Sequence, residues 1–171
     1  MENLMGGTPP VRYLPCVVPC KLYFIEQEIK SNICNTILRA LPDWFGVEAS
    51  IIDYVNQVKS MPFYVAYERE KPIGFVAIKI HNEYTAEISV MGIINEYQRG
   101  GIGTKLISSV EEYCRTNQFQ FLTVKTLADT VDFEPYERTR KFYYKIGFVP
   151  LEIFPLHWDI DNPCLFLAKK L

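Results

Sequence analysis

The strongest constraint on the fold is a group of three β-like segments that follow one another closely, at residues 63–68, 73–80 and 84–93. Short polar turns at 69–72 and 81–83 separate them. Such short connections join antiparallel neighbours, because a parallel connection needs a dozen or more residues. The sequence therefore predicts an antiparallel meander in the middle of the chain.

The second half of the chain alternates helices and strands. A helix is predicted at 102–116, with an apolar face that repeats at helical spacing, and a strand follows at 119–126. A strand, a helix and a further strand of these lengths predict a right-handed parallel crossover. A last helix at 135–146 and strands at 148–154 and 164–168 complete this half.

The first half is less regular. Residues 1–20 contain four prolines and are expected to form an irregular leader, and the β-forming residues at 21–29 predict a first strand. Ser31 is the expected N-cap of a helix that ends before Pro42, and a second helix follows it. We expect one α+β (mixed α/β) domain over 21–171, with about seven strands and four helices.

Composition excludes several classes of protein. Of the 171 residues, 49% are hydrophobic, which is too many for a disordered chain, and the net charge of −2 excludes a general basic surface for nucleic acid or anionic lipid. No apolar stretch approaches the ~18 residues of a membrane span. The five cysteines are an odd number, which is typical of reduced cytoplasmic thiols, and neither they nor His81 and His157 have the spacing of a metal site.

A glycine-rich loop, Gln98-Arg99-Gly100-Gly101-Ile102-Gly103-Thr104, lies between a predicted strand and a predicted helix. Glycines allow a sharp turn whose amides converge on one point, and the helix N-terminus adds positive charge. The loop is therefore suited to a phosphate or pyrophosphate group. It lacks the Gly-Lys-Ser/Thr ending of a nucleoside-triphosphate loop, and the meander before it excludes a dinucleotide fold. The alternative is a plain strand-to-helix turn.

The pattern Gln98-x-x-Gly101-x-Gly103 resembles the Gln/Arg-x-x-Gly-x-Gly/Ala signature of the GNAT superfamily of N-acetyltransferases. Residues 86–93 are similar to the fourth strand of that family, and residues 140–148 to its Phe/Leu-Tyr-x-x-x-Gly-Phe helix ending. The resemblance implies a central mixed, mostly antiparallel sheet flanked by helices. It also implies transfer of an acetyl group from acetyl-CoA to a primary amine of a small molecule or peptide, by direct attack in a ternary complex without a metal.

The resemblance further implies which residues contact coenzyme A: Met91, Gly92 and Ile93 at the end of the strand, and Gln98, Arg99, Gly100, Gly101, Ile102, Gly103 and Thr104 in the loop. Backbone near Met91–Ile93 would donate to the oxyanion that forms on the thioester. We expect a bulge at Gly92 that splays the sheet, the alternative being an ordinary strand end.

Two residues are expected to be catalytic. Strand alternation sets Glu87 with Thr85 and Ser89, opposite a core face of Ala86, Ile88 and Val90. Glu87 also matches the position of a catalytic glutamate in some members of the family and would act as a base, unless it is a solvated strand carboxylate. Tyr143 occupies the family's tyrosine position and would protonate the departing thiolate, unless it is a core tyrosine. Tyr136 stands where many members carry a cofactor-binding asparagine, which puts that contact in doubt.

The acceptor site is expected at Trp44, Phe45, Asp129 and Trp158, because aromatic walls with carboxylates suit a cationic amine. The alternative is ordinary loop charges around buried tryptophans. Two other functions stay open. One is a non-catalytic acyl-CoA-binding regulatory module with the same fold, and the other is an interaction module in which the glycine loop is only a turn. We expect a cytoplasmic monomer or homodimer with no nucleic-acid or membrane partner.

Overall fold

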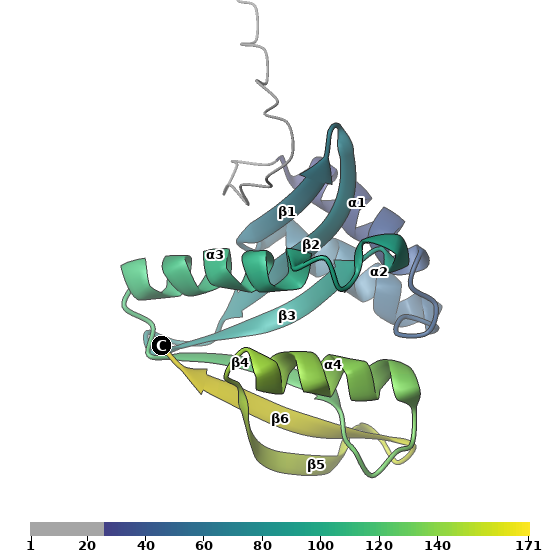
Figure 1. Ribbon diagram of the computed structural model, residues 1–171, viewed down its shortest axis with the longest axis vertical. Helices are drawn as coiled ribbons and strands as arrows, with labels where there is room; N and C mark the ends of the chain where they lie inside the picture. Colours follow the sequence, from purple (N-terminus) through teal and green to yellow (C-terminus); the bar gives the residue numbers. More distant parts are fainter. Residues whose placement is uncertain (1–25) are drawn as a thin grey trace, which may run out of the picture.

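The computed structural model describes residues 26–171 (Figure 1). Its helices are α1 (Gln27–Arg39), α2 (Glu48–Gln57), α3 (Ile102–Thr116) and α4 (Glu134–Lys145), with short 3-10 turns at Val58–Ser60 and Asn95–Tyr97. Its strands are β1 (Phe63–Glu68), β2 (Lys71–Ile80), β3 (Thr85–Ile93), β4 (Phe121–Leu127), β5 (Val149–Asp159) and β6 (Asn162–Lys170). They form one six-stranded sheet in the order β1-β2-β3-β4-β6-β5.

Most of the predicted topology is confirmed. β1, β2 and β3 form the antiparallel meander, and β3 and β4, which α3 connects, are the one parallel pair of the sheet. Helix α3 spans the residues predicted for it. The mixed α+β fold is therefore the observed one, with six strands in place of about seven. Among the described residues, no helix combines the length and apolar character that crossing a membrane requires.

The predicted N-terminal strand is wrong where it can be checked. Helix α1 already begins at Gln27, because the sequence Glu-Gln-Glu-Ile-Lys at 26–30 consists mainly of good helix formers. Ser31 is therefore not an N-cap. It lies inside α1, is buried, and donates a hydrogen bond from Oγ to the carbonyl of Val55 in α2, at 3.0 Å. The predicted leader and residues 21–25 lie outside the described residues.

Two hydrophobic cores lie on opposite faces of the sheet (Figure 1). On one face, α1 and α2 bury residues such as Ile37 and Leu38 against Phe63 and Phe75 of β1 and β2. On the other face, α3 and α4 cover a core that includes Leu106 of α3 and extends to β6. The sheet thus separates an α1/α2 face from an α3/α4 face.

A bulge in β3 changes which face its residues point to. Ala77 of β2 pairs with Val90, but Ile78 pairs with Ile88, so Ser89 is an extra residue. Ile88 therefore packs in the α3/α4 core and Val90 in the α1/α2 core, and the predicted shared face of Ile88 and Val90 is wrong.

The bulge predicted at Gly92 is also wrong. Gly92 pairs in regular register with Phe75. Its missing side chain instead makes room for α1, because a Cβ atom there would lie 2.9 Å from Cγ2 of Ile37. Gly92 is thus a packing residue between β3 and α1.

The parallel pair β3–β4 separates partway along its length. Pairing runs from Thr85↔Phe121 to Ile88↔Val124 and stops there, although β3 continues to Ile93 and β4 to Leu127. Figure 1 shows the two strands diverging toward the end of the sheet where α3 and α4 begin. We use the term splay for the two stretches that are not hydrogen-bonded to each other, from Ser89 onward in β3 and from Lys125 onward in β4. The expected splaying of the sheet is therefore present, and it begins at the Ser89 bulge.

Candidate active site

The glycine loop is tied to the end of β3. The side-chain amide of Gln98 donates hydrogen bonds to the carbonyl of Ile93 and to Oδ1 of Asn95, both at 3.0 Å. Arg99 and Gly101 then adopt left-handed backbone angles, with φ of 63° and 80°. A Cβ atom at Gly101 would meet nothing within 4 Å, so glycine suits this position for its backbone conformation and not for lack of space.

The loop leaves backbone amides pointing away from the helix. Lys105 donates from its N–H to the carbonyl of Gly101 at 3.1 Å. The amides of residues 102–104 come before that bond and have no carbonyl partner within the helix, as at the start of any α-helix. They are free backbone donors at the positive end of a 15-residue helix, in the turn that Arg99 and Gly101 form. This geometry is the one expected of an anion site.

Gly103 has a different reason to be glycine. A Cβ atom there would lie 3.0 Å from Cζ of Phe142, so its absence lets α3 approach α4 closely. Two of the predicted cofactor residues therefore have structural roles, because Gly103 lets α3 pack against α4 and Gln98 fixes the loop to β3. Arg99 and Gly101 form the turn itself.

The splay lies next to this loop along β3. The backbone of Met91, Gly92 and Ile93 belongs to its unpaired stretch, as the predicted contact with coenzyme A requires. On the opposing stretch of β4, Thr126 is buried, and its Oγ1 has no hydrogen-bond partner. An unsatisfied buried hydroxyl lowers the stability of the fold by about 1–3 kcal/mol, and a polar ligand lying in the splay would supply the missing hydrogen-bond partner. Sequence reasoning missed Thr126, which no local pattern in β4 distinguishes.

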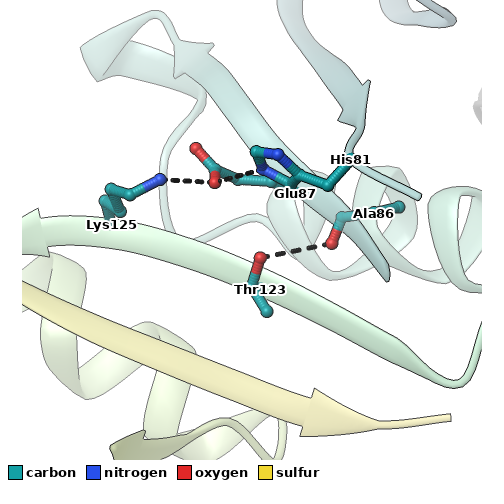
Figure 2. A network of polar contacts seen from close by, with 5 residues as sticks. All are labelled: His81, Ala86, Glu87, Thr123 and Lys125. Atoms are coloured by element: carbon teal, nitrogen blue, oxygen red, sulfur yellow. Dashed lines mark hydrogen bonds and ion pairs between the residues drawn. The ribbon is translucent and has the colours of Figure 1, made fainter. Parts of the chain in front are cut away.

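The carboxylate of Glu87 is held between two basic side chains. Oε2 lies 2.5 Å from Nζ of Lys125 and 2.7 Å from Nε2 of His81, and both dashed lines in Figure 2 end at this one oxygen. Burial raises the pKa of Glu87, but the hydrogen bonds and charges of Lys125 and His81 outweigh it, so the net pKa is lowered. Glu87 is thus a buried, ionised and paired carboxylate, not a solvated one.

Tyr143 is buried in the α3/α4 core, with its ring 5.3 Å from the rings of Phe142 and Phe148. Burial raises its pKa, and nearby Tyr136 adds to the shift, so the phenol is protonated at neutral pH. Glu87 lies on the opposite face of the sheet, because its neighbours Ala86 and Ile88 pack in the α3/α4 core. The structure therefore does not place the two predicted catalytic side chains side by side.

Two further tyrosines near the site have raised pKa values. Burial raises the pKa of Tyr136 to about 12, and Tyr54 contributes to that shift. The pKa of Tyr54 is raised by burial and next by the charge of Glu87.

The loop between α1 and α2 is anchored to α4. The indole N–H of Trp44 donates to Oγ1 of Thr139 at 3.0 Å, and the hydroxyl of Tyr136 donates to the carbonyl of Trp44 at 3.2 Å. The guanidinium of Arg138 lies 5.4 Å from the centre of the Trp44 indole. Tyr136 therefore holds this loop. Phe45 packs edge-on against Tyr54, at 6.1 Å between ring centres.

Trp158 reaches Glu87 through a row of contacts on β4, β6 and β5. Nζ of Lys125 lies 5.8 Å from the ring centre of Phe166, which lies 6.2 Å from that of Phe154. Phe154 and Trp158 both contact His157, at 6.3 and 5.8 Å between ring centres. We call this row, from Glu87 to Trp158, the Glu87 surface.

The four predicted acceptor residues therefore do not form one cluster. Trp44 contacts α4, Phe45 packs against Tyr54, and Trp158 stands at the far end of the Glu87 surface. Asp129 lies apart in a hollow beside α4, lined by Asp132, Glu137, Arg140 and Tyr144 among others. Within residues 26–171, no group of three or more metal-ligating side chains is found.

Many solved structures share this fold, and three of them illustrate the similarity. A GNAT family acetyltransferase from Elizabethkingia anophelis, solved with acetyl-CoA bound, is 20% identical with a TM-score of 0.61, covering 79% of this chain and 88% of its own. The IAA acetyltransferase of Bacillus cereus is 24% identical with a TM-score of 0.63, covering 86% and 96%. The ribosomal-protein-S18-alanine N-acetyltransferase of Escherichia coli is 15% identical with a TM-score of 0.64, covering 82% and 86%.

Sequence comparison assigns the family. No curated protein matches the chain in sequence. A sequence model described as "Acetyltransferase (GNAT) family" matches residues 32–148, which include β1 to β4, the glycine loop and α4. The chain belongs to the GNAT family of acetyltransferases.

Proposed function

We propose that this protein is an N-acetyltransferase that moves an acetyl group from acetyl-CoA to a primary amine of a small molecule or peptide. The observation that carries the proposal is the splay between β3 and β4, which lies directly beside the anion-site geometry of residues 98–104. A long ligand with a phosphate-rich end and a polar arm fits that combination. The acetyl-CoA bound to the Elizabethkingia relative supports this choice of ligand.

Each part of the cofactor has residues suited to it. The amides of residues 100–104 and the Arg99 guanidinium would bind the pyrophosphate. The backbone of Met91–Ile93 would pair with the pantetheine arm, and Thr126 Oγ1 would gain the partner it lacks. Gln98 would act indirectly, by fixing the loop to β3.

The chemistry requires a neutral amine and a stabilised oxyanion. The amine nitrogen attacks the thioester carbonyl, and the C–N bond forms as the carbonyl becomes an oxyanion. The nitrogen loses one proton, and the oxyanion collapses to the amide as the C–S bond breaks and the CoA thiolate leaves. A backbone N–H of the Met91–Ile93 segment would donate to the oxyanion. Glu87 would take the amine proton at the oxygen that Lys125 and His81 leave unoccupied, directly or through water. Tyr143, which burial keeps protonated, would donate a proton to the CoA thiolate.

A second candidate is a non-catalytic acyl-CoA-binding module. The pairing of Glu87 with two basic groups favours it, because a carboxylate with a lowered pKa is a weak base. In both cases we propose a cytoplasmic location, which suits the three buried free thiols of the described residues, Cys34, Cys114 and Cys164.

The test combines binding and turnover. Thermal unfolding of the purified chain is measured with and without acetyl-CoA, and release of the CoA thiol is measured with polyamines, aminoglycosides, amino acids and peptides. We expect stabilisation by acetyl-CoA and turnover of at least one amine class. Stabilisation without turnover of any amine supports the binding module, and no stabilisation at all contradicts both functions.

A further inference from the structure

Lys125 presents a primary amine to the proposed base, Glu87. Its Nζ lies 2.5 Å from Oε2 of Glu87, and Figure 2 shows the two side chains reaching toward each other from the neighbouring strands β4 and β3. The proposed acceptor is also a primary amine, and a base must form a hydrogen bond with the amine before it can take a proton from it. The chain therefore already holds, against the proposed base, a group of the chemical class that it is proposed to acetylate.

Lys125 also lies where the splay begins. Ile88 and Val124 are the last paired residues of β3 and β4, and Lys125 is the first residue of β4 beyond them. On the register of the paired stretch, Met91 is two residues further along than Lys125, which is roughly 7 Å for the rise per residue of a parallel strand. The flexible four-carbon side chain of lysine can cross such an offset. The amine is therefore within reach of a thioester held beside the backbone of Met91.

The surroundings of Lys125 shelter its amine from water. The side chain is 23% exposed, and Nζ lies 5.8 Å from the ring centre of Phe166. Lys141 offers a comparison, because its Nζ lies at the same 2.5 Å from a carboxylate oxygen, that of Glu137, while its side chain is 71% exposed. Uncatalysed acetylation by free acetyl-CoA depends on exposure, so it would modify Lys141 before Lys125.

We propose that Lys125 is a self-acetylation site, to which the chain transfers the acetyl group of its own bound acetyl-CoA. The inference rests on the proposed function, since it uses the same donor and the same base. Glu87 takes one proton from the Lys125 ammonium, and the neutral nitrogen attacks the thioester carbonyl. The C–N bond forms, the C–S bond breaks and the CoA thiolate leaves. Of the two protons that the nitrogen loses, one ends on the CoA thiol and one passes from Glu87 to water.

Acetylation would change the environment of Glu87. Acetyl-lysine carries no charge, so the Lys125 ion pair would be lost and the hydrogen bond from His81 would remain. The ammonium is one of the groups that lower the pKa of Glu87, and its loss makes this carboxylate a stronger base. The modification would therefore release the proposed base from the ion pair that weakens it.

The experiment incubates the full chain with acetyl-CoA and no added amine, and follows acetylation of each lysine by peptide mass spectrometry. General-base catalysis contributes ~10²–10⁴-fold, so we expect an initial rate at Lys125 at least about 10-fold above that at Lys141. The rate per chain should not depend on protein concentration, because donor and amine belong to one complex. Gly101→Ala, which is expected to weaken acetyl-CoA binding, should slow acetylation of Lys125 and leave that of Lys141 unchanged.

Equal rates at Lys125 and Lys141 overturn the proposal, and so does a rate at Lys125 that rises with protein concentration or that Gly101→Ala leaves unchanged. Thermal stabilisation by acetyl-CoA and turnover of the amine panel are measured on the same preparation. A chain that acetylates an added amine but leaves Lys125 unmodified keeps the proposed function and overturns only the self-acetylation site. A chain that acetyl-CoA does not stabilise, and that is unmodified at Lys125, loses both.

Discussion

Replacing Lys125 with methionine leaves the buried carboxylate of Glu87 with Nε2 of His81 as its remaining hydrogen-bond partner among the described residues. The side chains of Glu87 and Lys125 are 11% and 23% exposed, so water replaces little of the lost interaction. Breaking a fully buried ion pair costs 3–5 kcal/mol, and a hydrogen bond to a charged group contributes about 1.5–3 kcal/mol. Because His81 stays in place, we expect Lys125→Met to lower the free energy of unfolding by about 2–3 kcal/mol at pH 7.

The sign of the pH dependence follows from the pKa of Glu87. In the wild type that pKa is lowered, so the ion pair stabilises the fold above the ordinary glutamate range and this stabilisation is lost as pH falls. In Lys125→Met, burial is opposed by His81 alone, the pKa rises, and the carboxylate protonates more readily. The difference between wild type and variant should therefore be largest at pH 7 and shrink toward pH 4.

Urea unfolding at several pH values measures this difference, with Lys141→Met as the matched control. Lys141 forms an equally short pair with Glu137, but both side chains are at least half exposed, and such surface pairs contribute less than about 1 kcal/mol. A second check is Glu87→Gln combined with Lys125→Met, which should recover part of the loss. The reasoning is refuted if Lys125→Met and Lys141→Met lower the free energy of unfolding by the same amount, or if the effect of Lys125→Met does not depend on pH.

Three further substitutions test other parts of the site. Gly101→Ala should lower the free energy of unfolding by about 1–2 kcal/mol, because φ is 80° at this position, and should weaken acetyl-CoA binding measured by calorimetry. Gly100→Ala should change both quantities little, because Gly100 has no positive φ and the nearest atom to its Cβ would lie at 3.5 Å. Gly92→Ala should lower stability by about 1–3 kcal/mol in thermal unfolding, because its Cβ would lie 2.9 Å from Ile37; an unchanged melting temperature would contradict the packing role. Trp44→Phe removes the indole donor to α4 and should raise the acceptor KM more than the KM for acetyl-CoA; equal effects would count against an acceptor role for this loop.

The elements that could be predicted from the sequence are those with strong local signals. Short polar turns predicted the meander of β1, β2 and β3. The helical spacing of apolar residues predicted both ends of α3 correctly. The first strand failed because its predicted range, 21–29, included the helix-forming residues from 26 onward with which α1 begins.

The site was harder to predict because its geometry depends on contacts between distant segments. No local sequence pattern marks Ser89 as a bulge. The bulge is favoured by contacts with distant segments, because it lets β3 pack against both hydrophobic cores. Likewise, the pairing of Glu87 with Lys125 depends on the parallel register that sets Glu87 opposite Thr123. The glycine loop was predictable because its amides and φ angles are local properties.

Hydrogen–deuterium exchange with and without acetyl-CoA tests most directly whether the splay and the glycine loop hold the cofactor together. Acetyl-CoA should slow exchange at the amides of residues 91–93 and of residues 100–104 and leave the β1–β2 turn near Arg69 unchanged. Protection in both segments is the predicted result. Protection confined to the hollow beside Asp129, or none at either segment at saturating acetyl-CoA, would contradict it.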